Sequence, residues 1–231
     1  MRAFTSLAGH ILGSHPQISG YYEMHISYDS GQALQRQLEQ FLETDDLKAD
    51  SRYLFDKLLH NDYLLQLERL DISDTKILLA LREPEQSIRS IVNLFAKKAA
   101  DELYASPVEA TQYYCERVKA LAGFCRATGH DFYYFDAEVL QSAPEILLPR
   151  MSRWLELDSP LSEGYTIFSQ TGESRKGDSS SNIRSGTINR ARSDYSAIAI
   201  PERQLEMARQ VYRDCRRQMI DGATDSVTKS E

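Results

Sequence analysis

Residues 76–90 read KILLALREPEQSIRS, a pattern typical of a buried strand that leads directly into a helix. The apolar run at 77–81 has the length and composition of a central strand in a parallel sheet. Pro84 suits the first turn of a helix, where its missing N–H costs nothing, so Arg82 stands at the carboxyl end of the strand. Together with the hydroxyl of Ser90 on the new helix, this arginine makes a pocket suited to a phosphate. An ordinary strand–helix junction with a surface arginine is the alternative interpretation.

The composition is that of an ordinary globular chain. Its 231 residues are enough for one α/β domain with a substantial core. A net charge of −7 argues against a general nucleic-acid binder, which needs a broad basic surface, but not against a small anionic ligand. No apolar run approaches the roughly 20 residues of a membrane span, and no signal peptide is visible. Cys115, Cys125 and Cys215 have no metal-ligand spacing, so we expect reduced thiols in a cytoplasmic protein.

Strand and helix patterns alternate along the chain. Strands are expected at 18–22, 53–57, 77–81 and 131–136, and helices at 5–14, 30–44, 64–70, 85–103, 107–128, 145–155 and 201–219. This alternation predicts the α/β class, with a central parallel sheet that carries helices on both faces. We expect one domain over residues 1–220 and a disordered tail over 221–231.

The segment at 82–90 resembles a known phosphate-binding motif. Its spacing, Arg-x-Pro-x-x-Ser-x-x-Ser, is similar to the 3′-phosphate segment of sulfotransferases that use the donor PAPS (3′-phosphoadenosine 5′-phosphosulfate). The resemblance assigns the 3′-phosphate to Arg82 and Ser90.

A second motif resembles the 5′-phosphosulfate loop of bacterial and tyrosylprotein-type sulfotransferases. Residues 2–16 read RAFTSLAGHILGSHP, in which Arg2 takes the place of the loop's basic residue and Thr5 and Ser6 take the hydroxyl positions. Such a loop surrounds an oxyanion with a helix N-terminus, hydroxyls and a cation. Phe4 replaces the glycine that lets backbone amides approach the phosphate in the family.

The family also has an apolar strand directly before this loop. Here the chain begins at Met1, so the expected strand is absent and an edge of the parallel sheet would be exposed. We expect a start codon assigned too far downstream, or a fragment; a degenerate relative is the alternative.

The resemblance also implies the catalytic residues. In the tyrosylprotein type the base is a glutamate after the second strand, and Glu23 takes that position. Asp56-Lys57 is similar to the Asp-Lys motif of bacterial members, so Lys57 takes the role of stabilising the transferred sulfuryl group. His60 is a competing base, because cytosolic members use a histidine shortly after a comparable lysine, and His25 is a weaker candidate.

A loop at 175–188 resembles a further segment of the bacterial enzymes. It also contains Arg-Lys-Gly, which in cytosolic members binds the 3′-phosphate, so Arg175, Lys176 and Gly177 join the predicted cofactor site. A flexible basic loop is the alternative. The acidic motif that begins at Asp136 matches one that precedes the family's next helix, and we expect it to be structural.

The motifs occur in the family's order and cover about residues 2–190, which implies a P-loop NTPase-like fold. We expect a sulfotransferase that moves a sulfuryl group from PAPS to a small-molecule, carbohydrate or peptide acceptor, with PAP as product and without a metal. The alternative is a catalytically degenerate nucleotide-binding or interaction protein of the same fold, as Phe4 and the missing strand would suggest. A nucleoside or shikimate-type kinase is excluded, because Gly-x-x-x-x-Gly-Lys-Ser/Thr is absent.

Overall fold

The computed structural model describes residues 2–70, 75–98, 102–169, 171, 181–191 and 194–229, which form a mixed α/β fold. The helices are α1 (Thr5–Ser14), α2 (Ala33–Leu42), α3 (Pro84–Ala96), α4 (Pro107–Ala127), α5 (Val139–Ser142), α6 (Pro144–Trp154) and α7 (Glu202–Gly222). The strands are β1 (Ile18–Ser19), β2 (Tyr53–Leu54), β3 (Ile77–Leu81), β4 (Phe132–Asp136) and β5 (Asp225–Val227). Short 3₁₀ turns lie at Leu67–Arg69, Leu103–Ala105 and Ser181–Ser185. The predicted α/β class is confirmed.

The chain divides into two compact units, where the sequence predicted one domain over residues 1–220. Unit 1 consists of residues 1–3, 77–139 and 191–231, and unit 2 consists of residues 4–76 and 140–190. Each unit combines stretches that are distant in the sequence. Local patterns, which report on a few neighbouring residues, carry no sign of such a division.

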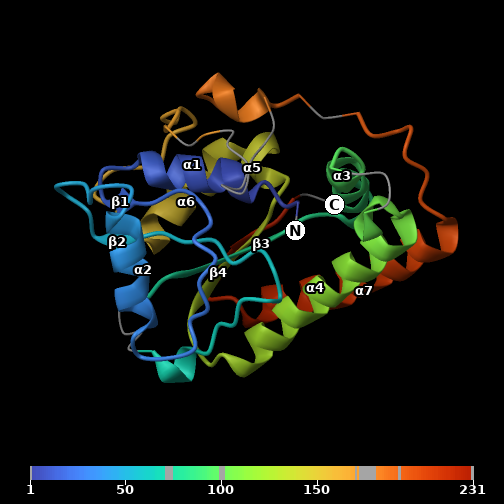
Figure 1. Cartoon of the computed structure of the whole chain (residues 1–231), viewed down its shortest axis with the longest axis horizontal. Coiled ribbons are helices and arrows are strands. Elements are labelled where there is room, and N and C mark those ends of the chain that lie inside the picture. The colour runs from blue at the N-terminus through green and yellow to red at the C-terminus, as the bar shows by residue number, and fades with distance from the viewer. Residues whose placement is uncertain are drawn as a thin grey trace. The chain divides into compact units, whose positions relative to one another are not determined.

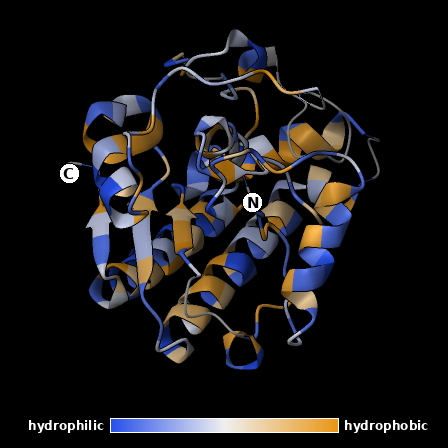
Figure 2. Cartoon of the chain, turned by 90° about the vertical axis from the view of Figure 1, so that its left-hand side faces the viewer, coloured by the Kyte–Doolittle hydropathy of each residue, from blue (hydrophilic) through white to orange (hydrophobic). Residues whose placement is uncertain are grey.

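The sheet of unit 1 is parallel, with the strand order β3-β4-β5. β3 pairs with β4 over its whole length, from Ile77 opposite Phe132 to Leu81 opposite Asp136. All five residues of β4 are buried, as expected for a strand with a neighbour on each side in a covered parallel sheet. Figure 2 shows β3 as apolar, whereas β5 is mostly hydrophilic. Two of the predicted strands and their parallel pairing are thereby confirmed.

Helices α4 and α7 run alongside each other in unit 1 (Figure 1). Both helices carry fully buried side chains, among them Tyr114 and Val118 of α4 and Met219 of α7. α4 begins with Pro107 at its first position, directly after Ser106, as the sequence predicted.

Within the predicted disordered tail over 221–231, the described residues 221–229 include the end of α7 and a short strand. α7 continues to Gly222, and β5 then pairs in parallel with β4. Val227 is buried, and the N–H of Lys229 donates a hydrogen bond to Oδ2 of Asp136 at 2.9 Å. The sequence gives no sign of β5, because its three residues include a single apolar side chain. Its position depends on backbone pairing with β4.

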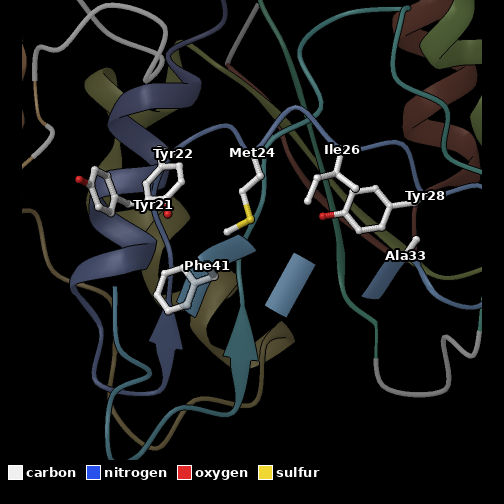
Figure 3. Packing of buried hydrophobic residues seen from close by; sticks show 7 residues of the cluster. All are labelled: Tyr21, Tyr22, Met24, Ile26, Tyr28, Ala33 and Phe41. Carbon is white, nitrogen blue, oxygen red and sulfur yellow. The ribbon is translucent and has the colours of Figure 1, made fainter. Parts of the chain in front are cut away.

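Unit 2 contains α1, α2 and the parallel pair β1–β2, in which Ile18 lies opposite Tyr53. Its core follows the chain from Tyr21 to Tyr28 (Figure 3). The members of this cluster are Tyr21, Tyr22, Met24, Ile26, Tyr28, Ala33 and Phe41. β1 is shorter than the predicted strand at 18–22, because Gly20 adopts a left-handed conformation, with φ of 82°, and turns the chain.

α1 approaches the backbone of residues 20–21 closely. A Cβ atom on Gly9 would lie 2.4 Å from the carbonyl oxygen of Tyr21, and one on Gly13 would lie 2.5 Å from that of Gly20. Glycine inside a helix costs about 1 kcal/mol relative to alanine, so its presence at both positions is explained by this contact.

Candidate functional site

Arg82 lies at the carboxyl end of β3, where α3 begins. Its side chain is 12% exposed, and Nη1 donates a hydrogen bond to the carbonyl oxygen of Arg2 at 3.1 Å. Nε of Arg2 donates in turn to Oγ of Ser90 on α3 at 3.1 Å. The hydroxyl of Tyr114 donates to the carbonyl oxygen of Arg82 at 2.7 Å and connects this strand end to α4. The structure thus brings together three residues that the sequence assigned to phosphate groups, and we call Arg2, Arg82 and Ser90 the anion cluster.

One assignment within this cluster differs from the prediction. The sequence motif placed Arg2 at the 5′-phosphosulfate, whereas its side chain contacts Ser90, in the segment predicted for the 3′-phosphate. The backbone of Arg2 also receives the hydrogen bond from Arg82, so both arginines belong to one arrangement at the start of α3.

The first turn of α3 adds to the cluster. Pro84 occupies the first helical position, as predicted, and the side chain of the preceding Glu83 makes no capping hydrogen bond. A helix N-terminus has unpaired N–H groups and a partial positive charge, which attract an anion. Ser87 is fully buried, and its hydroxyl has no hydrogen-bond partner within the part of the chain that the structure describes. A buried polar group without a partner costs about 1–3 kcal/mol.

Asp136 lies at the end of β4 and is fully buried. It accepts hydrogen bonds from Nε and Nη2 of Arg216 on α7 at 2.9 and 2.7 Å, and from the hydroxyl of Tyr134 at 2.8 Å. The bonds to Asp136 raise the pKa of Arg216 above its ordinary value. Since its oxygens are engaged with α7, β4 and the chain after β5, Asp136 is a structural carboxylate.

Glu138 belongs to the acidic motif that begins at Asp136, which the sequence predicted to be structural, and it was not predicted as a site residue. Its Oε1 accepts a hydrogen bond from the N–H of Glu83 at 2.9 Å and lies 4.0 Å from Nε of Arg82. Burial raises the pKa of Glu138 to about 7. The sequence signal is only its place two residues after Asp136, and the contact with α3 depends on the sheet that brings the two strand ends together.

In unit 2, Thr5 and Ser6 form the first turn of α1, which contains no acidic residue. Phe4 precedes them with φ of 53° and ψ of 21°, the left-handed conformation that glycine adopts without strain. The backbone at position 4 therefore has a conformation that favours glycine, although the residue is phenylalanine.

The predicted base lies among histidines. Glu23 is 5% exposed, and its Oε1 lies 3.7 Å from Nδ1 of His25 and 3.8 Å from Nε2 of His60. We call these three residues the carboxylate–histidine cluster. Burial lowers the pKa of His60, and the charge of Glu23 opposes this shift. A buried carboxylate next to an imidazole is an arrangement that can accept and pass on a proton.

The neighbouring Asp56 and Lys57 are both predicted motif residues. Asp56 accepts hydrogen bonds from the N–H of Met24 at 2.8 Å, the hydroxyl of Tyr28 at 2.8 Å and the N–H of Lys57 at 2.6 Å. Burial raises the pKa of Asp56, and these hydrogen bonds oppose the shift. Asp56 thus binds the backbone directly after Glu23, at Met24, and the backbone of Lys57. Lys57 itself is buried, at 5% exposure.

The remaining predicted cofactor residues, Arg175, Lys176 and Gly177, lie outside the described residues. Within the described ranges, no three His, Cys, Asp or Glu side chains are grouped in a way that could hold a metal ion. Among the same residues, no helix has the length and apolar character needed to cross a membrane.

No family model, curated protein or solved structure matches the chain.

Proposed function

We propose that the chain is a PAPS-dependent sulfotransferase, which moves a sulfuryl group from PAPS to a hydroxyl or amine. The observation that carries the proposal is the anion cluster, in which two arginines and a serine meet at the end of a parallel strand and the start of a helix. These are the groups that bind a phosphate monoester such as the 3′-phosphate of PAPS. The proposal includes a P-loop NTPase-like sheet with helices on both faces, in a cytoplasmic protein.

The proposal assigns the chemistry to Glu23, Lys57 and His60. The carboxylate of Glu23 takes the proton of the acceptor hydroxyl, the acceptor oxygen bonds to sulfur, and the bond between sulfur and the 5′-phosphate oxygen breaks to release PAP. Lys57 stabilises the negative charge on the transferred group. His60, whose pKa burial lowers, is neutral at pH 7 and is the second candidate base. Small-molecule, carbohydrate and peptide acceptors are all consistent with this chemistry.

The donor's other contacts follow the sequence resemblance. In the proposal, Thr5 and Ser6 bind the 5′-phosphosulfate, and Arg175, Lys176 and Gly177 contribute to the 3′-phosphate site.

One observation favours a second candidate function. Phe4 places a large side chain at the position where the resembled loop has only a hydrogen atom, although its backbone keeps the left-handed conformation. In this candidate the chain binds a nucleotide phosphate through the anion cluster and transfers nothing.

Calorimetric titration with PAP tests the anion cluster. We expect Arg82→Ala to weaken PAP binding by about 2 to 4 kcal/mol, or about 30- to 1000-fold, because it leaves a phosphate unpaired in a partly buried site. Arg82→Lys should recover part of this loss, since an ammonium cannot make the bidentate contact. Arg126→Ala, at an exposed position of α4, is the matched control. Unchanged PAP affinity in a folded Arg82→Ala protein would remove the basis of the proposal.

A turnover assay separates the base from the binding groups. Glu23→Gln should leave PAP affinity nearly unchanged and lower turnover by about two to four orders of magnitude, the usual contribution of a positioned base. His60→Ala should have a smaller effect, and Glu39→Gln on α2 controls for the loss of an unrelated carboxylate. The reverse ranking of Glu23 and His60 would move the base to His60. PAP binding without transfer to any acceptor class would favour the second candidate function.

A further inference from the structure

The carboxylate of Glu138 lies against the start of α3. Oε1 of Glu138 accepts a hydrogen bond from the N–H of Glu83, directly before the helix, at 2.9 Å. The same oxygen lies 4.0 Å from Nε of Arg82. A backbone N–H at a helix start and an arginine are the groups that an incoming phosphate or sulfate would use. Glu138 therefore makes, from inside the protein, contacts of the kind that an anionic ligand needs.

Glu138 occupies a partly exposed position next to Arg82. Its side chain is 23% exposed, and its ion-pair contact with Arg82 is long. Asp136, two residues earlier, accepts both bonds of Arg216, so this second arginine is already engaged. Displacement of the Glu138 carboxylate would therefore break its hydrogen bond with the N–H of Glu83, whereas the pair of Asp136 with Arg216 would stay intact.

Charged and titratable groups face Glu138 from each element around it. Arg82 and Glu83 come from the β3–α3 junction, and Asp136 comes from β4. The others are Tyr114 on α4, Tyr212 and Arg216 on α7, and Lys229 after β5, whose ammonium is paired with Glu83. Burial is the largest influence on Glu138 and raises its pKa to about 7, ahead of the opposing effect of Arg82. Its charge therefore changes close to neutral pH.

We propose that Glu138 is an internal competitor at the anion cluster, so that binding of a phosphate or sulfate group displaces or neutralises its carboxylate and is coupled to uptake of a proton. The inference concerns regulation of the site in the proposed function and rests on that site. Two anions cannot share one arginine and one helix start without repulsion. The ligand therefore binds the form in which Glu138 is neutral, and its apparent affinity follows the fraction of that form.

The expected change of anion affinity with pH follows from the fraction of Glu138 that is neutral. With a pKa of about 7, about nine-tenths of Glu138 is neutral at pH 6 and about one-tenth at pH 8. Affinity for an anion of constant charge should therefore fall by about tenfold between pH 6 and pH 8.

Inorganic sulfate is the probe, because its charge does not change over this range. Its dissociation constant is measured at pH 6 and pH 8 by calorimetry, at constant ionic strength, for the parent chain, Glu138→Gln and Glu116→Gln. The last variant removes an exposed carboxylate of α4 in the same unit. We expect the parent and Glu116→Gln to bind about tenfold more weakly at pH 8. Glu138→Gln should bind equally at both pH values, at least as tightly as the parent at pH 6. Glu138→Ala gives the same test if the glutamine variant does not fold.

An equal pH dependence in the parent and in Glu138→Gln would overturn the inference, as would the absence of sulfate binding to both proteins at pH 6. A parallel calorimetric titration with PAP distinguishes this inference from the proposed function. The protonation of PAP itself also depends on pH, but this effect is the same for all variants and cancels when they are compared. If sulfate shows the expected pattern and PAP binds no better than sulfate, the proposed function is wrong and the role of Glu138 as internal competitor is supported. If PAP binds tightly with the same pH dependence in the parent chain and in Glu138→Gln, Glu138 is not a competitor and the proposed function is supported.

Discussion

Alanine at Gly13 tests the close packing of α1 in unit 2. A Cβ atom at this position would lie 2.5 Å from the carbonyl oxygen of Gly20 and 2.7 Å from Cβ of Tyr21. Neither neighbour is the far end of a flexible side chain, so the contact can be relieved only by movement of α1 or of the chain at residues 20–21. That chain leads directly to Glu23, and α1 begins with Thr5 and Ser6.

Two effects of opposite sign determine the result. Alanine is better than glycine inside a helix by about 1 kcal/mol. Overpacking of a well-filled region costs about 1–3 kcal/mol, and a contact this short belongs in the upper part of that range. We therefore expect Gly13→Ala to lower the free energy of unfolding by about 1 to 2 kcal/mol.

Gly123 in α4 provides the matched control, because a Cβ there meets no atom within 4 Å. Gly123→Ala should raise the free energy of unfolding by up to about 1 kcal/mol through helix propensity alone. Urea unfolding followed by far-UV circular dichroism measures both changes, and thermal midpoints should shift in opposite directions by about 2–4 °C per kcal/mol. If Gly13→Ala stabilised the protein as much as Gly123→Ala, the close approach of α1 would be wrong.

Three further predictions concern other parts of the chain. Asp136→Asn removes the charge that pairs with Arg216, so the free energy of unfolding in urea should fall by about 3 to 5 kcal/mol. A loss below about 1 kcal/mol would contradict the structural role of this pair. The free energy of unfolding in urea should be about 1 kcal/mol larger for Phe4→Gly than for Phe4→Ala, because only glycine accepts φ of 53° without strain. Equal free energies of unfolding for the two variants would contradict that conformation. Burial raises the pKa of Cys125 to about 12, so its thiol should stay unreactive toward a thiol reagent at pH 8 until urea unfolds the protein. Rapid labelling of Cys125 in the native chain would contradict its burial.

The β3–α3 junction could be predicted from the sequence because its signals are local. The apolar run at 77–81 and Pro84 define the strand and the helix start within a few residues, and the structure confirms both. The strand predicted at 131–136 forms at Phe132–Asp136 for the same reason, since its residues are nearly all aromatic. Where the residues themselves supply the burial and the turn chemistry, the sequence pattern is sufficient.

The parts that could not be predicted depend on contacts between distant residues. β5 has one buried apolar residue, Val227, and its place is set by the backbone of β4. Glu138 gains its contact with Arg82 only because β3 and β4 end at the same level of the sheet. The proximity of Glu23 to His60 likewise depends on residues 37 positions apart, and the motif order suggested both residues without indicating that they lie together.

The distribution of backbone strain in the described residues also bears on the two clusters. Phe4, His25 and Glu156 are the non-glycine residues with positive φ in this part of the chain. Glu156 is explained by the end of α6: its N–H donates to the carbonyl oxygen of Arg153, and that of Leu157 donates to Ser152, the hydrogen bonds that close a helix with a left-handed residue. Phe4 instead begins α1, and His25 lies 3.7 Å from Glu23. A left-handed non-glycine residue costs about 1–2 kcal/mol, and such strain persists where the surrounding structure holds it in place. At Phe4 and His25 this strain does not serve to end a helix. Phe4 directly precedes Thr5, which the proposed function assigns to the 5′-phosphosulfate, and His25 lies two residues after Glu23, the proposed base.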